Sequence, residues 1–245
     1  MSASFSKCRE KAYAVVSYIM RSSTEIPILT TPGDNEWNRC PNTSLALSNY
    51  TKYFIDIEDY WRNIHFLPSM IVRSKLRPEN WVFYYSRVLF LAINMVHYDE
   101  ETPDIEANSR LQENLDWFIE NCNKYCSDAR AVMMFGHSVA GASTIFYPIH
   151  QRLLQFNIPL VYFTGNGHKY FVKRGVGKGE LPGDYFWRVQ VDNGKYAPPI
   201  QITIRGNTVE KYYQQDEFYN VGFYQEIIGD NIKIDRRGGL YSNIA

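Results

Sequence analysis

The chain has 245 residues, with 26 lysine and arginine residues against 26 aspartate and glutamate residues, and aromatic residues make up 16% of it. This length suits one large α/β domain or two small ones and is enough to enclose a hydrophobic core. The balanced charge provides no global field for nucleic acid or an anionic membrane surface. No apolar stretch approaches the roughly 20 residues that a membrane-spanning helix requires.

The first half of the chain combines two kinds of hydrophobic pattern. Apolar residues three and four apart favour helices, and short β-branched or aromatic runs favour strands. Ser86 and Arg87 separate the last two strands of this half, as in a hairpin. The predicted elements are, in chain order, a helix at 7–20, a strand at 26–29, a helix at 45–60, a loop at 61–67 and strands at 81–85 and 88–93.

The second half continues this alternation and then turns to strands. Asn193 and Gly194 separate the last two strands, which favours an antiparallel hairpin. Helices that alternate with strands predict an α/β architecture with a mixed sheet. The predicted elements are a helix at 106–125, a strand at 131–135, a helix at 143–156 and strands at 158–163, 186–191 and 200–204.

The most informative segment follows the predicted strand at 26–29. A Pro-Gly pair interrupts the apolar run, and an acid, an amide and a second acid follow as Asp34, Asn35 and Glu36. Ligands of α/β sheets bind in the crevice outside the carboxyl ends of the strands, and hard divalent ions prefer oxygen donors. The segment therefore predicts a cation site. The alternative is an ordinary polar turn, because Pro, Gly, Asp and Asn are the usual turn residues.

The run Gly33 to Trp37, followed closely by Cys40, resembles the signature of one branch of the calcineurin-like metallophosphoesterases. The resemblance spans about residues 10 to 205. It implies a sandwich of two mixed sheets flanked by helices, and a centre of two divalent cations roughly 3.5–4 Å apart that clamp a phosphate ester. Three further motifs recur in the order of that branch, at 114–117, 135–137 and 165–168.

The resemblance implies metal ligands at Asp34, Asn35, His137 and His168, and catalytic roles for Asn35 and Glu36. Aligned on the glycine, Asp34 takes the place of a metal-binding Asn, Asn35 that of a proton-donating His, and Glu36 that of the acid that orients this His. A shift by one residue makes Asn35 the metal ligand instead, and both registers stay open. Asn has no titratable proton near neutral pH, so in the first register Asn35 is limited to a hydrogen bond to phosphate.

The two histidines differ in how well they match the family. His137 follows an apolar run and resembles the single metal-binding histidine at the end of a strand; the alternative is a histidine in a polar loop. His168 resembles the second histidine of a His-Gly-Asp-x-His motif, in which Thr164 replaces the first histidine and Asn166 the acid. A threonine hydroxyl is a poor substitute for imidazole on a transition metal, so one ligand is expected to be lost.

The resemblance makes 26–29 the family's third strand, so the first two strands and their Asp-x-His and Gly-Asp-x-x-Asp motifs have no counterpart in this chain. We expect a metallophosphoesterase-like domain at 1–208 that lacks these strands, and a tail at 209–245 that docks or is partly disordered. Absent strands leave unpaired backbone groups and uncovered apolar surface. This predicts a protein partner on that sheet edge, or pairing by the tail.

Two functions follow from the resemblance. The first is a degenerate phosphoesterase domain, weakly or not at all catalytic, that serves as a binding or structural subunit and needs no metal. The alternative is an active phosphoesterase for a small phosphoester, with Fe, Mn or Zn as cofactor, whose other ligands lie on missing sequence or on another chain.

The cysteines bear on the compartment. Asn42 and Asn49 each begin a glycosylation acceptor pattern. Together with the resemblance at Cys40, these patterns favour a secretory or extracytoplasmic setting in which Cys8 and Cys40 form a disulfide. The alternative is that all four cysteines are free, including the pair Cys122 and Cys126.

Overall fold

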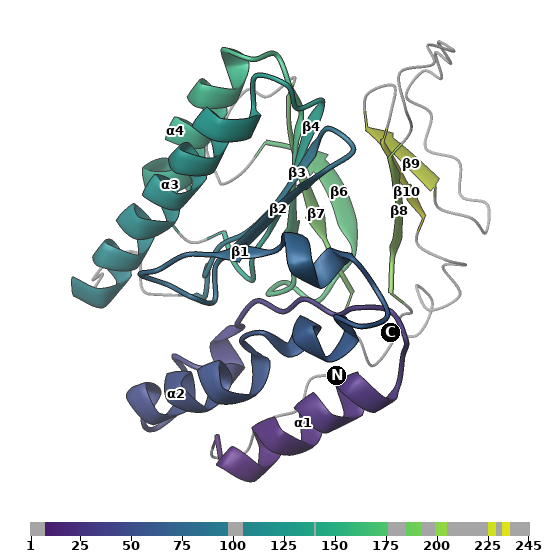
Figure 1. Ribbon diagram of the computed structural model, residues 1–245. Helices are drawn as coiled ribbons and strands as arrows, with labels where there is room; N and C mark the ends of the chain where they lie inside the picture. The colour runs from purple at the N-terminus through teal and green to yellow at the C-terminus, as the bar shows by residue number, and fades with distance from the viewer. Residues whose placement is uncertain are drawn as a thin grey trace.

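A mixed sheet of seven strands forms the centre of the structure (Figure 1). The computed structural model describes residues 8–97, 105–139, 141–175, 185–192, 199–204, 225–228 and 232–235. The strands of this sheet are β1 (Val72–Arg73), β2 (Trp81–Tyr85), β3 (Val88–Ala92), β4 (Ala131–Phe135), β5 (Leu160–Thr164), β6 (Phe171–Arg174) and β7 (Phe186–Gln190).

The strand order is β1-β2-β3-β4-β5-β7-β6. Strands β3, β4, β5 and β7 are parallel to one another, whereas β1, β2 and β6 pair antiparallel with their neighbours. The carboxyl ends of the four parallel strands therefore meet at one edge, where the candidate site lies. A second sheet of order β8-β10-β9 contains β8 (Gln201–Ile204), β9 (Gln225–Ile228) and β10 (Ile232–Asp235).

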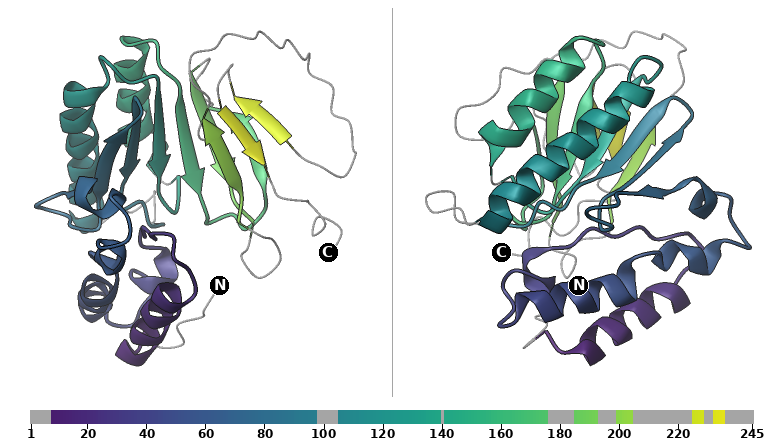
Figure 2. Two further views of the ribbon diagram at one scale, coloured as in Figure 1. Left: turned by 45° about the vertical axis from the view of Figure 1, so that its right-hand side comes forward. Right: turned by 60° about the vertical axis from the view of Figure 1, so that its left-hand side comes forward.

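Two long helices cover one face of the seven-stranded sheet, and the three-stranded sheet lies on the other (Figure 2). These helices are α3 (Ile105–Tyr125) and α4 (Ala142–Leu154). On the helix side, buried residues such as Leu89, Phe118 and Phe146 form the larger core. On the opposite side, Ile232 and Ile234 pack with residues of β4, β5 and β7. Apolar residues on both faces explain why the central strands read as continuous hydrophobic runs.

The amino-terminal part packs around a separate aromatic core and lies beyond one end of the large sheet (Figures 1 and 2). The core joins Tyr13, Tyr50, Phe54, Ile57 and Trp61. The helical segments are α1 (Glu10–Ser22), α2 (Thr43–Phe54) and three short 3₁₀ helices, η1 (Asp34–Glu36), η2 (Ile57–Trp61) and η3 (Leu67–Met70).

The predicted strand at 26–29 is wrong, because this segment belongs to neither sheet. Pro27 has no backbone N–H to donate to a ladder, and Ile26 is 70% exposed. Side chains hold the following residues instead: the indole of Trp81 donates to the carbonyl of Thr30 at 2.8 Å, and Thr31 Oγ1 donates to the carbonyl of Ile93 at 3.3 Å. The segment is an extended connection laid against the sheet.

Two further predictions need correction. The helix predicted at 45–60 is divided at Asp56, which adopts a left-handed φ of 59°, so that η2 follows α2 as a separate element. The hairpin predicted around Asn193 and Gly194 is also wrong: β7 pairs with β5 and β6, whereas β8 pairs with β10 in the other sheet. Asn193 and Gly194 themselves lie outside the described residues.

The other predicted elements are present with bounds shifted by a few residues at most. The hairpin at Ser86 and Arg87 is confirmed, and both residues adopt positive φ angles of 50° and 62°, as its two-residue turn requires. The structure thus confirms an α/β architecture with a large mixed sheet, a small second sheet and flanking helices. Strand β10, from the predicted tail, pairs with β8, and the rest of 209–245 apart from β9 lies outside the described residues.

Candidate functional site

The candidate site forms where η1 meets the carboxyl end of β4. His137 follows β4 after a single glycine, and its Nε2 lies 3.1 Å from Oδ1 of Asp34 in η1, so that an N–H at Nε2 donates to the carboxylate. The two residues are 103 positions apart in the chain. The fold therefore brings together two of the predicted metal ligands, at the edge of the sheet where α/β proteins bind ligands.

Asp34 is a buried carboxylate with cationic partners. Its side chain is 2% exposed, and Nε of Arg39 lies 3.0 Å from Oδ2, which is an ion pair without the alignment of a hydrogen bond. Burial by itself raises the pKa of Asp34, but the hydrogen bond and charge of His137, together with the charge of Arg39, outweigh it and lower this pKa. The site is built to keep Asp34 ionised.

Gly33 allows the imidazole of His137 to lie close to the main chain. A Cβ at Gly33 would lie 3.2 Å from Nδ1 of His137 and 2.5 Å from Oε2 of Glu36, whereas a Cβ at Gly165 would make an ordinary contact of 3.6 Å with the same Nδ1. Backbone N–H groups of Gly165 and Asn166 donate to the carbonyl of His137 at 3.1 and 3.0 Å. The loop after β5 therefore supports the loop after β4.

Glu36 lies beside this pair. Burial raises the pKa of Glu36, and the charge of nearby His137 only partly opposes this effect. The hydroxyl of Tyr13 in α1 donates to the backbone carbonyl of Glu36 at 2.8 Å, which ties η1 to the first helix. A carboxyl group with a raised pKa beside a histidine is a common feature of proton-transfer sites.

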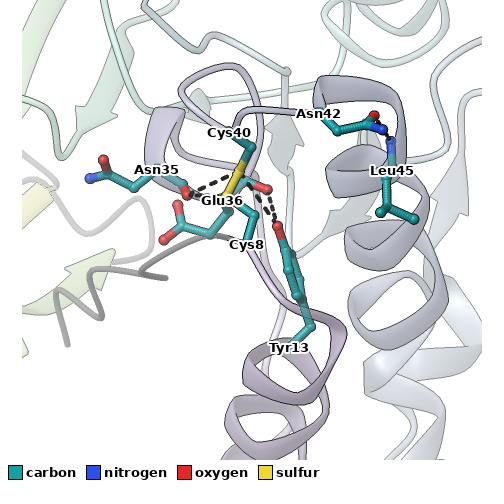
Figure 3. The surroundings of a disulfide bond; sticks show 7 residues. All are labelled: Cys8, Tyr13, Asn35, Glu36, Cys40, Asn42 and Leu45. Atoms are coloured by element: carbon teal, nitrogen blue, oxygen red, sulfur yellow. Dashed lines mark hydrogen bonds between the residues drawn. A yellow bond between two sulfur atoms is a disulfide. The ribbon is translucent and has the colours of Figure 1, made fainter.

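A disulfide between Cys8 and Cys40 closes the segment that carries η1 (Figure 3). The carbonyl of Asn35 lies 3.7 Å from the sulfur of Cys8 and 3.6 Å from that of Cys40. The bridge therefore lies against the backbone of η1 at Asn35, the residue between Asp34 and Glu36. The structure joins the cysteines that the sequence analysis pairs, and it also joins Cys122 of α3 to Cys126, the residue directly after that helix.

The remaining predicted residues are placed differently. Asn35 is exposed, and its side chain points away from the disulfide (Figure 3). His168 is exposed and has a left-handed φ of 56°, while Thr164, the residue in place of the first histidine, is buried. Of the predicted ligands, Asp34 and His137 are thus the pair that makes direct contact.

Gln190, which the sequence did not single out, organises the neighbouring strand ends. Its Oε1 accepts from Oγ1 of Thr164 at 2.8 Å and from the N–H of Gly167 at 3.2 Å, while its Nε2 donates to the carbonyls of Thr164 and Val191, both at 3.1 Å. Tyr13 and Arg39 were also missed. The signal for Gln190 is a polar residue ending an apolar strand. Tyr13 acts through a tertiary contact that no local pattern reveals, whereas Arg39 lies in the same loop as Asp34.

The donor set does not complete a metal centre. Among the residues that the structure describes, no group of three or more His, Cys, Asp or Glu side chains is arranged to hold a metal ion. Asp34 and His137 supply two donors that hydrogen bond to each other. A catalytic zinc site uses three protein ligands, so these two residues do not by themselves fit a metal.

No family model, curated protein or solved structure matches this chain. None of the described helices is long and apolar enough to cross a membrane. Fold by itself does not identify an activity, so a functional assignment depends on the geometry of the site and on the motifs that the sequence carries.

Proposed function

We propose that this chain is a degenerate calcineurin-like metallophosphoesterase domain that binds a protein partner and has little or no catalytic activity of its own. The observation that supports this proposal is the state of the Asp34 carboxylate, which His137 and Arg39 already contact on its two oxygens. An imidazole N–H and a positively charged side chain thus already contact the carboxylate that the resemblance assigns to a metal.

The chemistry of the pair favours this interpretation. A metal-binding imidazole is neutral and directs a lone pair at the metal, whereas Nε2 of His137 is engaged with Oδ1 of Asp34. A cation bound at this point must displace both His137 and Arg39 from a carboxylate that is 2% exposed. Because charge-assisted hydrogen bonds are about twice as strong as neutral ones, the pair is a stable arrangement without metal.

In this proposal, the protein partner binds at the β1 edge of the large sheet. Strand β1 pairs with Val82 and Trp81 of β2 alone, which leaves 83–85 without a described strand on that side. The rings of Phe66 and Tyr85 contact each other at this edge with centroids 5.5 Å apart. Exposed apolar side chains on β1, on β2 and next to them are Phe66, Val72, Leu76 and Tyr85. Such an edge favours pairing with another chain.

The test is elemental analysis of natively purified protein, combined with intact mass and a phosphatase assay with p-nitrophenyl phosphate in added Mn²⁺, Fe²⁺ or Zn²⁺. We expect less than stoichiometric metal and no turnover. About two bound metal equivalents, with turnover that His137→Ala abolishes and the matched variant His65→Ala preserves, would overturn the proposal.

A second candidate function is an active metal-dependent phosphoesterase completed by ligands on missing sequence or on another chain. The observation that favours it is Glu36, a carboxyl whose pKa is raised by burial next to His137, as a general acid requires. If it holds, the intact mass shows additional residues or a co-purifying chain, and Glu36→Gln lowers kcat while metal content stays unchanged.

A further inference from the structure

Arg188 lies on the helix-covered face of the large sheet, near the edge formed by β6. Side chains alternate along β7, so Arg188 shares a face with Phe186, and the ring of Phe186 packs against Phe146 of α4 with centroids 5.7 Å apart. In the antiparallel pair of β6 and β7, Arg188 lies directly opposite Lys173. Two cationic residues are therefore paired across strands on one face.

The guanidinium of Arg188 is poorly satisfied for a half-buried charge. Its Nη2 donates to Oε1 of Gln190 at a long 3.4 Å, and its Nε is buried without a hydrogen-bond partner. In the part of the chain that the structure describes, no carboxylate lies within ion-pair distance of Arg188. Burial lowers the pKa of Arg188. A desolvated charge without a counter-charge is costly.

Both cations gather over the same aromatic ring. The guanidinium carbon of Arg188 lies 4.9 Å from the centroid of Phe171, and Nζ of Lys173 lies 5.7 Å from it. Cation–π contacts offset part of the desolvation of each cation. They do not supply the counter-charge that the guanidinium of Arg188 lacks among the described residues.

We propose that Arg188 and Lys173 form a binding site for a small doubly charged oxyanion of the phosphate or sulfate class. The guanidinium supplies a fork of donors for two oxygens, and the ammonium of Lys173 supplies a second positive charge. The hydrogen bond to Gln190 orients the guanidinium. The site uses neither Asp34 nor His137, so it goes beyond the proposed function, and its test is independent of metal.

Arg152 of α4 provides a matched control. Its guanidinium carbon lies 5.0 Å from the ring centroid of Phe156, much like that of Arg188 over Phe171. However, its two Nη groups donate to the amide oxygens of Gln155 and Asn123. The two arginines thus share a phenylalanine contact and a buried Nε without a hydrogen-bond partner among the described atoms, but both Nη groups of Arg152 already have good acceptors.

The experiment is isothermal titration of the full chain with inorganic phosphate, sulfate and acetate in low-salt buffer with EDTA. We expect phosphate and sulfate to bind in the millimolar range or tighter, and Arg188→Met to weaken their Kd at least tenfold while Arg152→Met leaves it unchanged. Phosphate should raise the Tm of the wild type and of Arg152→Met but not that of Arg188→Met. In the absence of anion, the Tm of Arg188→Met should be higher than that of the wild type, because the substitution removes an uncompensated buried charge.

Three results would overturn the proposal. They are absence of phosphate and sulfate binding to the wild type, equal binding by Arg188→Met, and acetate binding as tight as that of phosphate, which would indicate a site for monoanions. If Arg188→Met does not fold, Lys173→Met repeats the titration with the guanidinium intact, and it must weaken phosphate binding more than acetate binding.

Discussion

Asp34 connects the sequence motif to a tertiary contact at the scale of single residues. The motif predicts a functional acid at this position, and the structure buries it against His137 and Arg39. The histidine was predicted as a ligand because it ends an apolar run, but its distance to Asp34 across 103 positions is not encoded in any local pattern. Arg39 escaped prediction because a surface cation near an acid is common in loops.

We expect Asp34→Asn to lower the free energy of unfolding by about 2 kcal/mol at pH 7, because it removes a charge-assisted hydrogen bond. Since the folded-state pKa of Asp34 lies below its ordinary value, this contribution is present above pH 4 and is lost as the pH falls through the folded-state pKa. Urea unfolding of both proteins at pH 7 and pH 3 measures the difference, which should shrink at pH 3. Asp59→Asn, in an exposed pair with Arg62, is the control and should change stability by less than about 0.5 kcal/mol. A cost that stays constant with pH would contradict this account.

His150 is a second residue whose burial has a measurable consequence. It is 4% exposed in α4, and neither ring nitrogen has a hydrogen-bond partner among the described atoms. Burial lowers the pKa of His150, so the unfolded chain binds the proton more readily than the folded one. The contribution of neutral, buried His150 to the free energy of unfolding is therefore fully present above the ordinary histidine pKa of about 6.5. This contribution falls as the pH decreases below that value. His150→Phe should flatten the decrease in Tm between pH 7 and pH 5, and His65→Phe should leave it unchanged. An identical decrease in all three proteins would exclude His150 as the cause.

At the scale of elements, hydrophobic periodicity predicted most of the strands and helices. The strands 81–85 and 131–135 were predicted with their observed bounds, because apolar side chains on both faces produce runs without alternation. Strand β6 was missed, since Lys173 and Arg174 interrupt its apolar character. The segment at 26–29 was predicted as a strand from its apolar residues, but a strand also needs a partner, and Pro27 limits its pairing.

The Cys8–Cys40 disulfide links the start of α1 to the segment after η1, and its removal should destabilise both elements. Its residues are 32 positions apart, so the loop-entropy model gives a stabilisation of about 3.7 kcal/mol. We expect Cys8→Ser/Cys40→Ser to lose about this much in denaturant unfolding, and a reductant to have little further effect. Cys122→Ser/Cys126→Ser removes a bridge over a far shorter loop, between α3 and the residue that follows it, and should lose less. Equal losses in both variants would contradict the loop-entropy explanation.

At the scale of the whole molecule, the sequence indicates which layers exist but not how they are joined. Helices α3 and α4 on one face and a second sheet on the other agree with the expected α/β class. The pairing of β8 with β10 joins residues 201–204 to 232–235, which local patterns do not reveal because register depends on contacts between distant segments. The candidate site is likewise a product of topology, since its residues come from η1 and from the loops after β4 and β5.

The β1 edge offers the last prediction, because Phe66, Val72, Leu76 and Tyr85, on this edge or next to it, are exposed apolar residues. The isolated chain should self-associate through this edge, since apolar surface and unpaired strand groups favour contact with a second copy when no partner is present. Sedimentation velocity over a range of protein concentrations should show a rising mean mass for the wild type.

Phe66→Lys combined with Val72→Lys should keep the chain monomeric, because each residue is more than half exposed (60% and 51%) and tolerates charge without core damage. Ile105→Lys, at the start of α3 and 89% exposed, is the control and should associate as the wild type does. A wild type that stays monomeric, or an Ile105→Lys variant that alone abolishes association, would show that another surface governs self-association.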